Sequence, residues 1–452
     1  MRNEALEQGD IAELWETSRS QSWPKLRIKT SLRSVVGGVW GAEPEDDTGI
    51  VCVRVADFDR VRLCVDDSPP TKRSYSESEL NGRQLVKNDL LIEKSGGGSN
   101  QPVGCVVRFD GDYEAVCSNF IARLELRSEH DARFWAYLHA AIYSARLNTL
   151  AIKQTTGIQN LDLDQYLGFR VVAPPYELQL AIADYLDRET AKIDTMIAAK
   201  ERLLKLLAEK RRALITDAVT RGLNPDAPMR DSGVEWLGEI PEHWSVDRFK
   251  FHMLGIEQGW SPQCLNVPAE LDEWGVLKAG CVNGPEFDTS QNKTLPPSLD
   301  PIVELEVKPG DLLMSRSNTT KLLGSTALVR EVRPKLLICD KLYRIEVNEE
   351  TAHKPFLVYL LRSAPGRHEF ERDATGASNS MQNIGQDSVK NVWLVFPPFD
   401  EQVAICRYLD QTLQRIDALR SNNLQTVTLL KERRAALIAA AVSGAQKVEA
   451  AT

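Results

Sequence analysis

Two long stretches of the chain carry apolar residues at alternating steps of three and four positions. The first stretch has neither Gly nor Pro between Tyr176 and Arg221, and each stretch follows a Pro-Pro pair, at Pro174 and at Pro397. This spacing is typical of a coiled-coil seam and predicts one long helix in each stretch. The predicted seam residues are Ile193, Ile197, Leu204, Leu207, Leu214, Ile416, Val427, Leu430 and Leu437.

Polar residues interrupt the predicted seams at Lys200, Arg211, Asn423 and Arg434. Such interruptions can set the register of a helix pair at some cost in stability. The alternative, in which each helix packs only on the core of its own domain, stays open on the sequence alone.

Outside these stretches the pattern changes to short runs rich in β-branched residues, separated by Gly, Ser, Asn and Pro. These runs predict strands at 50–55, 105–109, 121–126, 336–339, 342–347 and 392–396. One helix is expected near 133–148 and another near 355–363. The predicted fold class is therefore α+β, with two mixed α/β parts connected by two long helices.

The chain contains an internal duplication. Residues 174–219 match residues 397–442 with 19 identities in 46 positions, an offset of 223. Fainter matches lie upstream, among them Val86-Lys-Asn-Asp-Leu-Leu with Val307-Lys-Pro-Gly-Asp-Leu-Leu. Gln159-Asn160 likewise recurs as Gln382-Asn383. A repeat of about 222 residues predicts two copies of one unit, each a variable part followed by a strongly similar helical part.

The order of the parts predicts a geometry. If the two helices pair along their matching seams, they run antiparallel, which gives a rod with a globular part at each end and a pseudo-two-fold axis. A helix from about 190 to 220 is about 46 Å long at 1.5 Å per residue.

The most specific motif is Asp231-Ser-Gly-Val-Glu-Trp-Leu-Gly-Glu-Ile-Pro-Glu-His-Trp, which leads into the second variable part. With the repeated Pro-Pro blocks and the repeated Arg-Ala-Leu-Ile ends, it resembles the specificity subunit of type I restriction-modification systems. The resemblance extends from about Trp23 to Gly444. It implies two target-recognition domains that each read one half of an interrupted DNA site, with the helices as spacer.

The resemblance also implies partners. These are double-stranded DNA, two methyltransferase subunits docked on the helical regions, and restriction or motor subunits. The implied division of the chain is an N-terminal segment (1–22), a first target-recognition domain (23–173), a first helical spacer (174–222), a linker (223–240), a second target-recognition domain (241–396), a second helical spacer (397–444) and a tail (445–452).

Polar loops that follow the two matched strands are the candidates for base recognition. Arg can bond guanine and Asn or Gln can bond adenine through two hydrogen bonds, and glycines allow a close approach of the backbone. The candidates are Lys94, Ser95, Ser99, Asn100 and Gln101 in the first copy, and Arg316, Ser317, Asn318, Thr319 and Lys321 in the second.

Gln159, Asn160, Gln382 and Asn383 are further candidates for DNA contact. Because both copies retain them, a shared structural or phosphate-binding role is favoured over base recognition.

The net charge of −9 excludes a uniformly basic surface, so DNA binding requires local basic clusters. Residues 17–42 carry five basic residues and no acid, and residues 308–341 carry seven basic residues against three acids. Ordinary solvated faces remain the alternative for either cluster.

Catalysis, metals and cofactors are not expected. Ala173-Pro-Pro-Tyr176 and Phe396-Pro-Pro-Phe399 imitate a methyltransferase loop but lack its amide or carboxylate oxygen, so both are interpreted as helix starts. The acid in Glu306-Val-Lys308 has no counterpart in the first copy, which argues against a nuclease. The eight cysteines form no CxxC pair, and neither a P-loop nor a histidine cluster is present.

No run is apolar enough to span a bilayer, and the scattered cysteines are typical of a cytoplasmic protein. The sequence thus predicts a non-catalytic, DNA-binding specificity subunit. The alternatives are a coiled-coil scaffold without sequence-specific DNA binding and, less favoured, a fused restriction enzyme.

Overall fold

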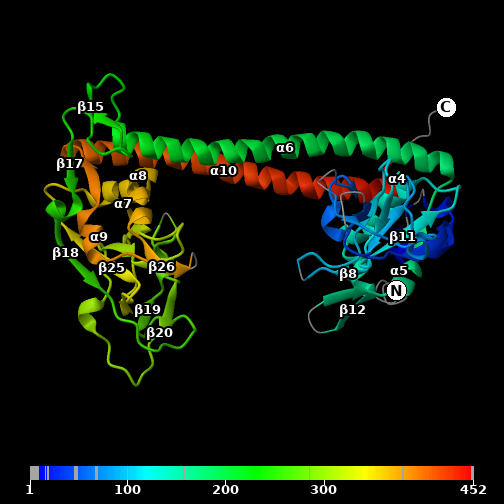
Figure 1. Cartoon of the computed structure of the whole chain (residues 1–452), viewed down its shortest axis with the longest axis horizontal. Coiled ribbons are helices and arrows are strands. Elements are labelled where there is room, and N and C mark those ends of the chain that lie inside the picture. Colours follow the sequence, from blue (N-terminus) through cyan, green and yellow to red (C-terminus); the bar gives the residue numbers. More distant parts are fainter. Residues whose placement is uncertain are drawn as a thin grey trace. The chain divides into compact units, whose positions relative to one another are not determined.

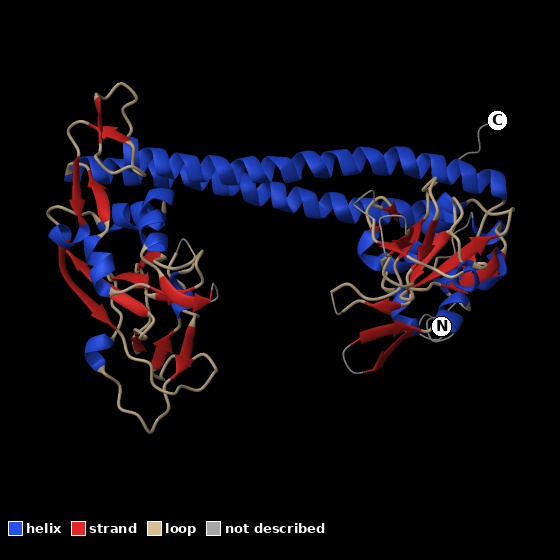
Figure 2. Cartoon of the chain, in the orientation of Figure 1, coloured by secondary structure: helices blue, strands red, loops and turns tan. Residues whose placement is uncertain are grey.

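The computed structural model describes residues 10–15, 17, 20–44, 49–66, 70–98, 100–155, 158–284, 286–378 and 381–448. It forms two compact units: unit 1 contains residues 1–201 and 425–452, and unit 2 contains residues 202–424. Each unit combines a mixed α/β part with a stretch of the two long helices, α6 (Tyr176–Arg221) and α10 (Phe399–Val442) (Figures 1 and 2). The predicted α+β class with two long antiparallel helices is confirmed.

Both long helices begin directly after their Pro-Pro pair, as expected from the absence of a donor N–H in proline. A buried glutamine fixes each start. Gln179 donates to Pro174 O at 2.8 Å and accepts from the N–H of Asp131 at 3.0 Å. In unit 2, Gln402 donates to Pro397 O and accepts from the N–H of His353. The identical glutamines therefore connect each long helix to the shorter helix before it.

The seam is buried within each unit. Ile193, Ile197, Leu207, Ile416 and Val427 are buried, whereas Leu204, Leu214, Leu430 and Leu437 are half-buried.

Two of the four polar interruptions, Arg211 and Arg434, contact the other long helix, whereas Asn423 donates to Leu419 O of its own helix. In unit 1, Arg434 Nε donates to Asp194 Oδ1 at 2.8 Å, and in unit 2 Arg211 lies 3.6 Å from Asp417. Arg211 matches Arg434 in the repeat, and Asp194 matches Asp417, so the two ion pairs are equivalent. Each pair joins the two helices in antiparallel orientation inside its own unit.

The sheets of unit 1 contain the three expected strands, which are β3, β9 and β11, and further strands that were not expected. The main sheet has the order β2-β11-β7-β9-β5-β4, and smaller sheets have the orders β10-β3-β6, β12-β13-β8 and β1-β14. Their bounds are β1 (Lys25–Arg27), β2 (Leu32–Gly37), β3 (Ile50–Val53), β4 (Phe58–Asp59), β5 (Cys64–Val65), β6 (Lys72–Arg73), β7 (Leu90–Glu93), β8 (Ser95–Gly96), β9 (Val106–Arg108), β10 (Ala115–Cys117), β11 (Ile121–Leu126), β12 (Ile152–Thr155), β13 (Ile158–Leu161) and β14 (Arg170–Val172).

The shorter helices of unit 1 are α2 (Ile11–Leu14), α3 (Glu77–Leu80), α4 (Ala132–Ser144), which lies within the expected range 133–148 but for its first residue, and α5 (Leu163–Leu167). Among them, α4 packs on β9 of the main sheet and α2 on β14. Phe134 and Trp135 of α4 are fully buried in a core that also contains Ile182 of α6 and Ile438 of α10. The helical stretch is therefore part of the core of unit 1.

Unit 2 repeats this plan with fewer strands in the main sheet, which has the order β18-β25-β21-β23. The other sheets have the orders β20-β19-β24, β22-β27-β26, β17-β28 and β15-β16. The bounds are β15 (Met229–Asp231), β16 (Glu239–Pro241), β17 (Ser245–Arg248), β18 (Met253–Gln258), β19 (Gly275–Leu277), β20 (Asn292–Thr294), β21 (Leu312–Ser315), β22 (Ser317–Asn318), β23 (Thr326–Leu328), β24 (Leu336–Leu337), β25 (Leu342–Val347), β26 (Thr375–Ser378), β27 (Met381–Asn383) and β28 (Trp393–Phe396).

Three shorter helices complete unit 2: α7 (Lys354–Arg362), α8 (Ala364–Arg372) and α9 (Gln386–Asn391). The single helix expected near 355–363 corresponds to α7. The expectation of one helix per variable part was wrong: α8 follows α7 directly with a Pro in its first turn, α9 comes later, and α3 and α5 lie in the first variable part.

The end of α10 contacts the N-terminal part of unit 1. Thr17 Oγ1 donates to Ser443 O at 3.2 Å, and a Cβ at Gly444 would lie 3.0 Å from the ring of Trp23. In unit 2 a Cβ at Gly222 would lie 3.1 Å from the ring of Trp244. Both glycines have positive φ, so each helix ends in a turn packed on the tryptophan that opens a variable part.

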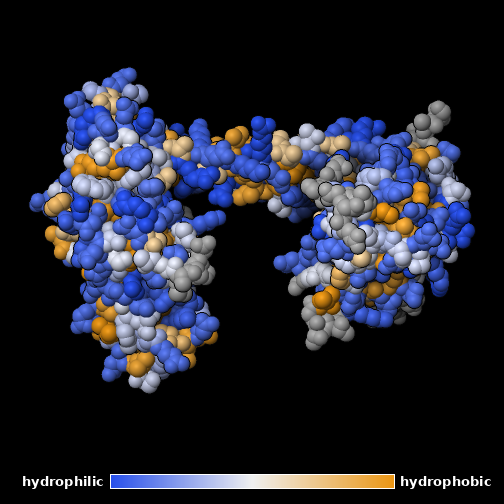
Figure 3. Space-filling view, viewed as in Figure 1, coloured by the Kyte–Doolittle hydropathy of each residue, from blue (hydrophilic) through white to orange (hydrophobic). Residues whose placement is uncertain are grey.

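Hydrophilic side chains cover most of the visible face of each unit, with hydrophobic ones scattered between them (Figure 3). Within the described residues, no helix is both long and apolar enough to cross a membrane.

Candidate nucleic-acid interface

The two kinds of candidate residues come together in one small sheet in each unit. In unit 1, β8 pairs antiparallel with β13, which places Ser95 opposite Asn160 and Gly96 opposite Gln159. In unit 2, β22 pairs with β27, which places Ser317 opposite Asn383. The same pairing brings Asn318 opposite Gln382. The variable loop of each copy therefore starts against the retained Gln-Asn pair.

In unit 1 the sheet edge is built around glycines. Gly97 has a φ of +67°, and a Cβ there would lie 2.6 Å from the N atom of Val103. Ser95 Oγ donates to Asn160 Oδ1 at 2.6 Å, and Gln159 Oε1 accepts from the N–H of Val103 at 3.2 Å. Only glycine permits this tight return of the loop.

The exposed members of the unit 1 loop are Asn100 and Gln101, whereas Lys94 and Ser95 are half-buried. Ser99 lies outside the described residues. Within this loop, Asn100 and Gln101 are thus the described candidates open to a ligand, and Asn160 on the neighbouring strand is exposed as well.

In unit 2 the candidates divide in the same way. Ser317 is buried, and Asn318 donates from Nδ2 to Asn283 Oδ1 at 2.8 Å. Arg316 is half-buried and donates from Nη1 to Asp340 O at 3.3 Å. Thr319 and Lys321 are exposed. Arg316 therefore supports the loop from within, and the open side chains follow it.

The retained Gln-Asn pairs occupy the central strand of each small sheet. Their amides contact the protein: Gln159 holds Val103, and Gln382 Nε2 lies 3.4 Å from Gly376 O. These contacts favour a structural role for the retained pairs, which is one of the two roles expected for them.

Side chains that were not predicted from the sequence hydrogen-bond to the backbone of the unit 1 loop, at residues 100–103. Three of them lie at the end of α4 and just after it, and all donate to main-chain carbonyls. Tyr143 OH donates to Pro102 O at 2.8 Å, Arg146 Nη2 to Asn100 O at 3.1 Å and Asn148 Nδ2 to Val103 O at 2.7 Å.

Unit 2 uses different residues for the same purpose. Arg367 donates to Leu323 O at 3.1 Å and to Thr320 O at 2.8 Å. Arg362 donates to the carbonyls of Val282 and Asn283 at 2.9 Å. Burial and the nearby charge of Arg367 lower the pKa of Arg362 to about 10. Both copies use an arginine, Arg146 and Arg367, which lie 221 positions apart in the repeat, whereas Tyr143 and Asn148 have no counterpart among the unit 2 anchors.

A buried ion pair lies beneath the unit 1 loop. Arg60 Nη2 donates to Glu93 Oε2 at 3.0 Å, and a Cβ at Gly96 would lie 3.2 Å from Glu93 Oε1. Burial raises the pKa of Glu93, while Arg60 opposes that rise. At the same position unit 2 has Ser315, which donates to Leu322 O at 2.8 Å.

The basic clusters are exposed in part. In the first cluster Lys25, Arg27, Lys29 and Arg33 are exposed, and Arg33 lies 3.2 Å from Glu125. Arg19 lies outside the described residues.

In the second cluster Arg333 and Lys335 donate to main-chain carbonyls, and Lys341 lies 3.0 Å from Asp340. Lys308, Lys321 and Arg330 are exposed.

The described residues contain no group of His, Cys, Asp and Glu that could hold a metal ion. Both Pro-Pro motifs precede the first residue of a long helix, as interpreted from the sequence.

The fold is that of solved type I restriction-modification chains. A chain from a study of complex assembly and conformational transition in a type I system superimposes with a TM-score of 0.68, at 16% identity, over 94% of this chain and 98% of that one. The HsdS subunit from Thermoanaerobacter tengcongensis gives a TM-score of 0.50 at 16% identity, over 94% and 97%.

Relatives in sequence include specificity subunits of type I restriction enzymes. The EcoEI specificity subunit of Escherichia coli is 28% identical over 220 residues, which cover 48% of this chain and 37% of that protein. The EcoKI specificity subunit of E. coli K12 is 23% identical over 79% of this chain and 76% of that protein. No family model matches the chain. The resemblance to type I restriction enzyme specificity subunits is confirmed in both sequence and fold.

Proposed function

We propose that the chain is the non-catalytic, DNA-binding specificity subunit of a type I restriction-modification complex and recognises a two-part DNA site with an unread gap. One observation carries this proposal. Two copies of one unit place loops of different sequence at the same position, against the same retained Gln-Asn pair. Two equivalent frames with different exposed polar side chains suit two readers of different half-sites.

In this proposal residues 23–173 and 241–396 are the target-recognition domains. The segments 174–222 and 397–444 are the helical spacers, and 223–240 is the linker. Asn100 and Gln101 contact one half-site, and Thr319 and Lys321 contact the other. Exposed Lys25, Arg27 and Lys29 contribute phosphate contacts, whose strength falls with salt.

The helical parts support docking of the same partner twice. Met196 and Leu419 occupy matched positions and are 55% and 53% exposed. Leu206 and Leu429, also matched, are 51% and 55% exposed. Exposed apolar side chains repeated in both copies fit two identical methyltransferase subunits. Methylation and ATP-dependent cleavage then belong to partner subunits.

The proposal is tested by Thr319→Ala with Lys321→Ala in a host that expresses the complete system. Sequencing of methylated sites should show relaxed discrimination in one half of the motif, because direct contacts are worth about 1–3 kcal/mol per base. Asn100→Ala with Gln101→Ala is the matched variant and should relax the other half.

Equal weakening at all sequences would identify phosphate contacts instead. Relaxation of both halves by either variant would contradict the proposal. Arg316→Ala is less informative, because it also releases the Asp340 carbonyl.

A further inference from the structure

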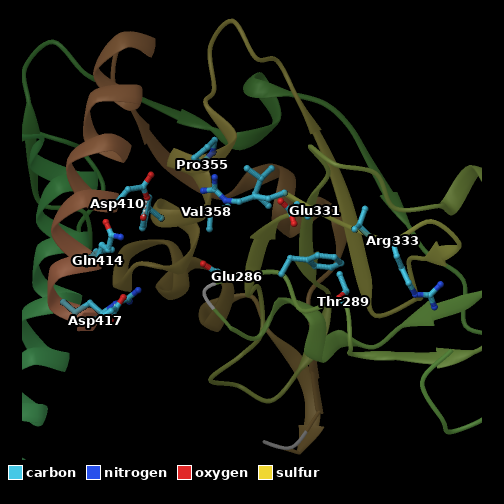
Figure 4. Close-up of a pocket in the computed structure, with 16 residues that line it drawn as sticks. Glu286, Thr289, Glu331, Arg333, Pro355, Val358, Asp410, Gln414 and Asp417 are labelled. Atoms are coloured by element: carbon cyan, nitrogen blue, oxygen red, sulfur yellow. Dashed lines mark hydrogen bonds and ion pairs between the residues drawn. The ribbon is translucent and has the colours of Figure 1, made fainter. Parts of the chain in front are cut away.

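Unit 2 contains a cavity of about 1120 Å³ beside Arg211 and Asp417, whereas the cavity beside the matched pair of unit 1, Arg434 and Asp194, has about 540 Å³. Its walls are α7, α10, the end of β23 and the segments 286–289 and 330–333, with Arg211 of α6 (Figure 4). Asp410, Gln414 and Asp417 of α10 face it across from Glu286 and Thr289 (Figure 4).

The duplication shows which part of unit 1 fills the equivalent place. Leu312 pairs with Leu328 in unit 2 as Leu90 pairs with Arg108 in unit 1, so β23 corresponds to β9. In unit 1 the sheet continues beyond β9: β5 pairs with β9 in parallel, and the N–H of Arg108 donates to Leu63 O at 2.9 Å. In unit 2 the main sheet ends at β23.

The turn between β4 and β5 also covers the helices of unit 1. Arg434 Nη2 donates to Val61 O at 2.5 Å while its Nε holds Asp194. Under this cover the side chains of Arg434 and Asp194 are 13% and 26% exposed.

The same ion pair is uncovered in unit 2. Arg211 and Asp417 are 3.6 Å apart, and their side chains are 29% and 51% exposed. The N–H of Val329 donates to Asp311 O on the β21 side. Successive N–H groups of a strand point to opposite sides, so the N–H of Leu328 points away from β21. It is directed toward the cavity that Leu328 lines. Segment 283–291, the counterpart of 58–71, is shorter, and its described residues form no strand.

We propose that this cavity binds an extended segment of a partner protein, which takes the place that the β4–β5 turn takes in unit 1. One carbonyl of the segment accepts from Leu328 N–H and another from Arg211, as Leu63 and Val61 do in unit 1. An apolar side chain between them contacts Val358 and Leu413. Addition of a strand to an exposed sheet edge is a general mode of peptide recognition.

The cavity carries charges of both signs. Glu286, Glu331, Asp410 and Asp417 line it together with Arg211, Arg330 and Arg333. The unit 1 turn is mixed in the same way, since residues 57–66 contain Arg60 and Arg62 beside Asp57, Asp59 and Asp66. The bound segment is therefore expected to carry both signs of charge. This inference requires no contact with DNA and is independent of the proposed function.

A peptide with the sequence of residues 57–66, carrying Cys64→Ser and a fluorescent label, tests the inference by anisotropy with the full-length chain. Saturable binding is expected. Arg211→Ala should weaken it at least tenfold, and Val358→Trp, which fills the cavity, should abolish it. Arg212→Ala, an exposed neighbour on α6, is the control and should leave binding unchanged.

Circular dichroism of each variant ensures that a loss of binding is not a loss of folding. Binding that survives both Arg211→Ala and Val358→Trp, or equal binding of a scrambled peptide, would overturn the inference. Absence of saturable binding to the unmodified chain would overturn it as well. Concentration-dependent dimerisation abolished by Val358→Trp would assign the cavity to a second copy and also overturn it.

Discussion

Several residues that are identical in the two copies make the same structural contact in each unit. Tyr137 OH donates to Asp187 Oδ1 at 2.8 Å in unit 1, and Tyr359 OH donates to Asp410 Oδ1 at 2.5 Å in unit 2. The buried glutamines at the helix starts behave in the same way. Identity between copies thus marks shared architecture, and the residues that differ are the better candidates for recognition.

Gln402→Ala should lower the free energy of unfolding of unit 2 by about 1–3 kcal/mol. The substitution leaves a buried N–H and two carbonyls without partners, and unsatisfied buried groups carry this cost. Denaturant unfolding measures the change. Gln411→Ala, at an exposed position of α10 in unit 2, is the control and should change stability by less than about 0.5 kcal/mol. Equal effects of the two variants would contradict the role given to Gln402.

Because His139 is buried, we expect the stability of unit 1 to fall in acid. Burial lowers the pKa of His139 to about 3, from about 6.5 in an unfolded chain. Because the folded state excludes the proton, this contribution to stability is complete above pH 6.5 and is lost as the pH falls toward 3. Calorimetry at pH 7.5 and pH 5 should show a smaller fall in Tm for His139→Gln than for the unmodified chain. An unchanged pH dependence would contradict this account.

At the scale of elements, the sequence predicted six of the strands, β3, β9, β11, β24, β25 and β28, but neither the many shorter strands nor which strands pair. Alternation and β-branched residues located 121–126 and 342–347, which are β11 and β25. The pairing of β8 with β13 joins residues more than sixty positions apart, and local patterns carry no information about such contacts. For the same reason Arg146 and Arg367 could not be recognised as loop anchors from the sequence.

Arg146 and Arg367 should each affect only the loop of their own unit. Arg367→Ala releases the carbonyls of Thr320 and Leu323 and should reduce discrimination in the half-site read by unit 2 about tenfold, at about 1.4 kcal/mol. Methylation assays on single-base variants of the site measure this, and Arg367→Lys should restore part of it.

Arg146→Ala is the matched variant in unit 1 and should affect only the other half-site. A general loss of stability without a preference for one half-site would show that Arg367 has only a structural role.

At the scale of the whole molecule, the duplication was visible in the sequence because 19 matched identities fall in one helical block. The sequence did not show which segments make up each unit. Each unit contains parts of both long helices, so that α6 up to Glu201 packs with the end of α10 in unit 1. Sequence order places these segments more than two hundred residues apart, and only the fold brings them into one core.

The most direct test of the central claim is a map of methylated adenines in the host genome with and without this gene. If the chain is a two-part DNA reader, deletion should remove methylation at one gapped motif with two fixed halves, and the gene supplied in trans should restore it. Persistence of every gapped adenine motif after deletion would contradict the claim.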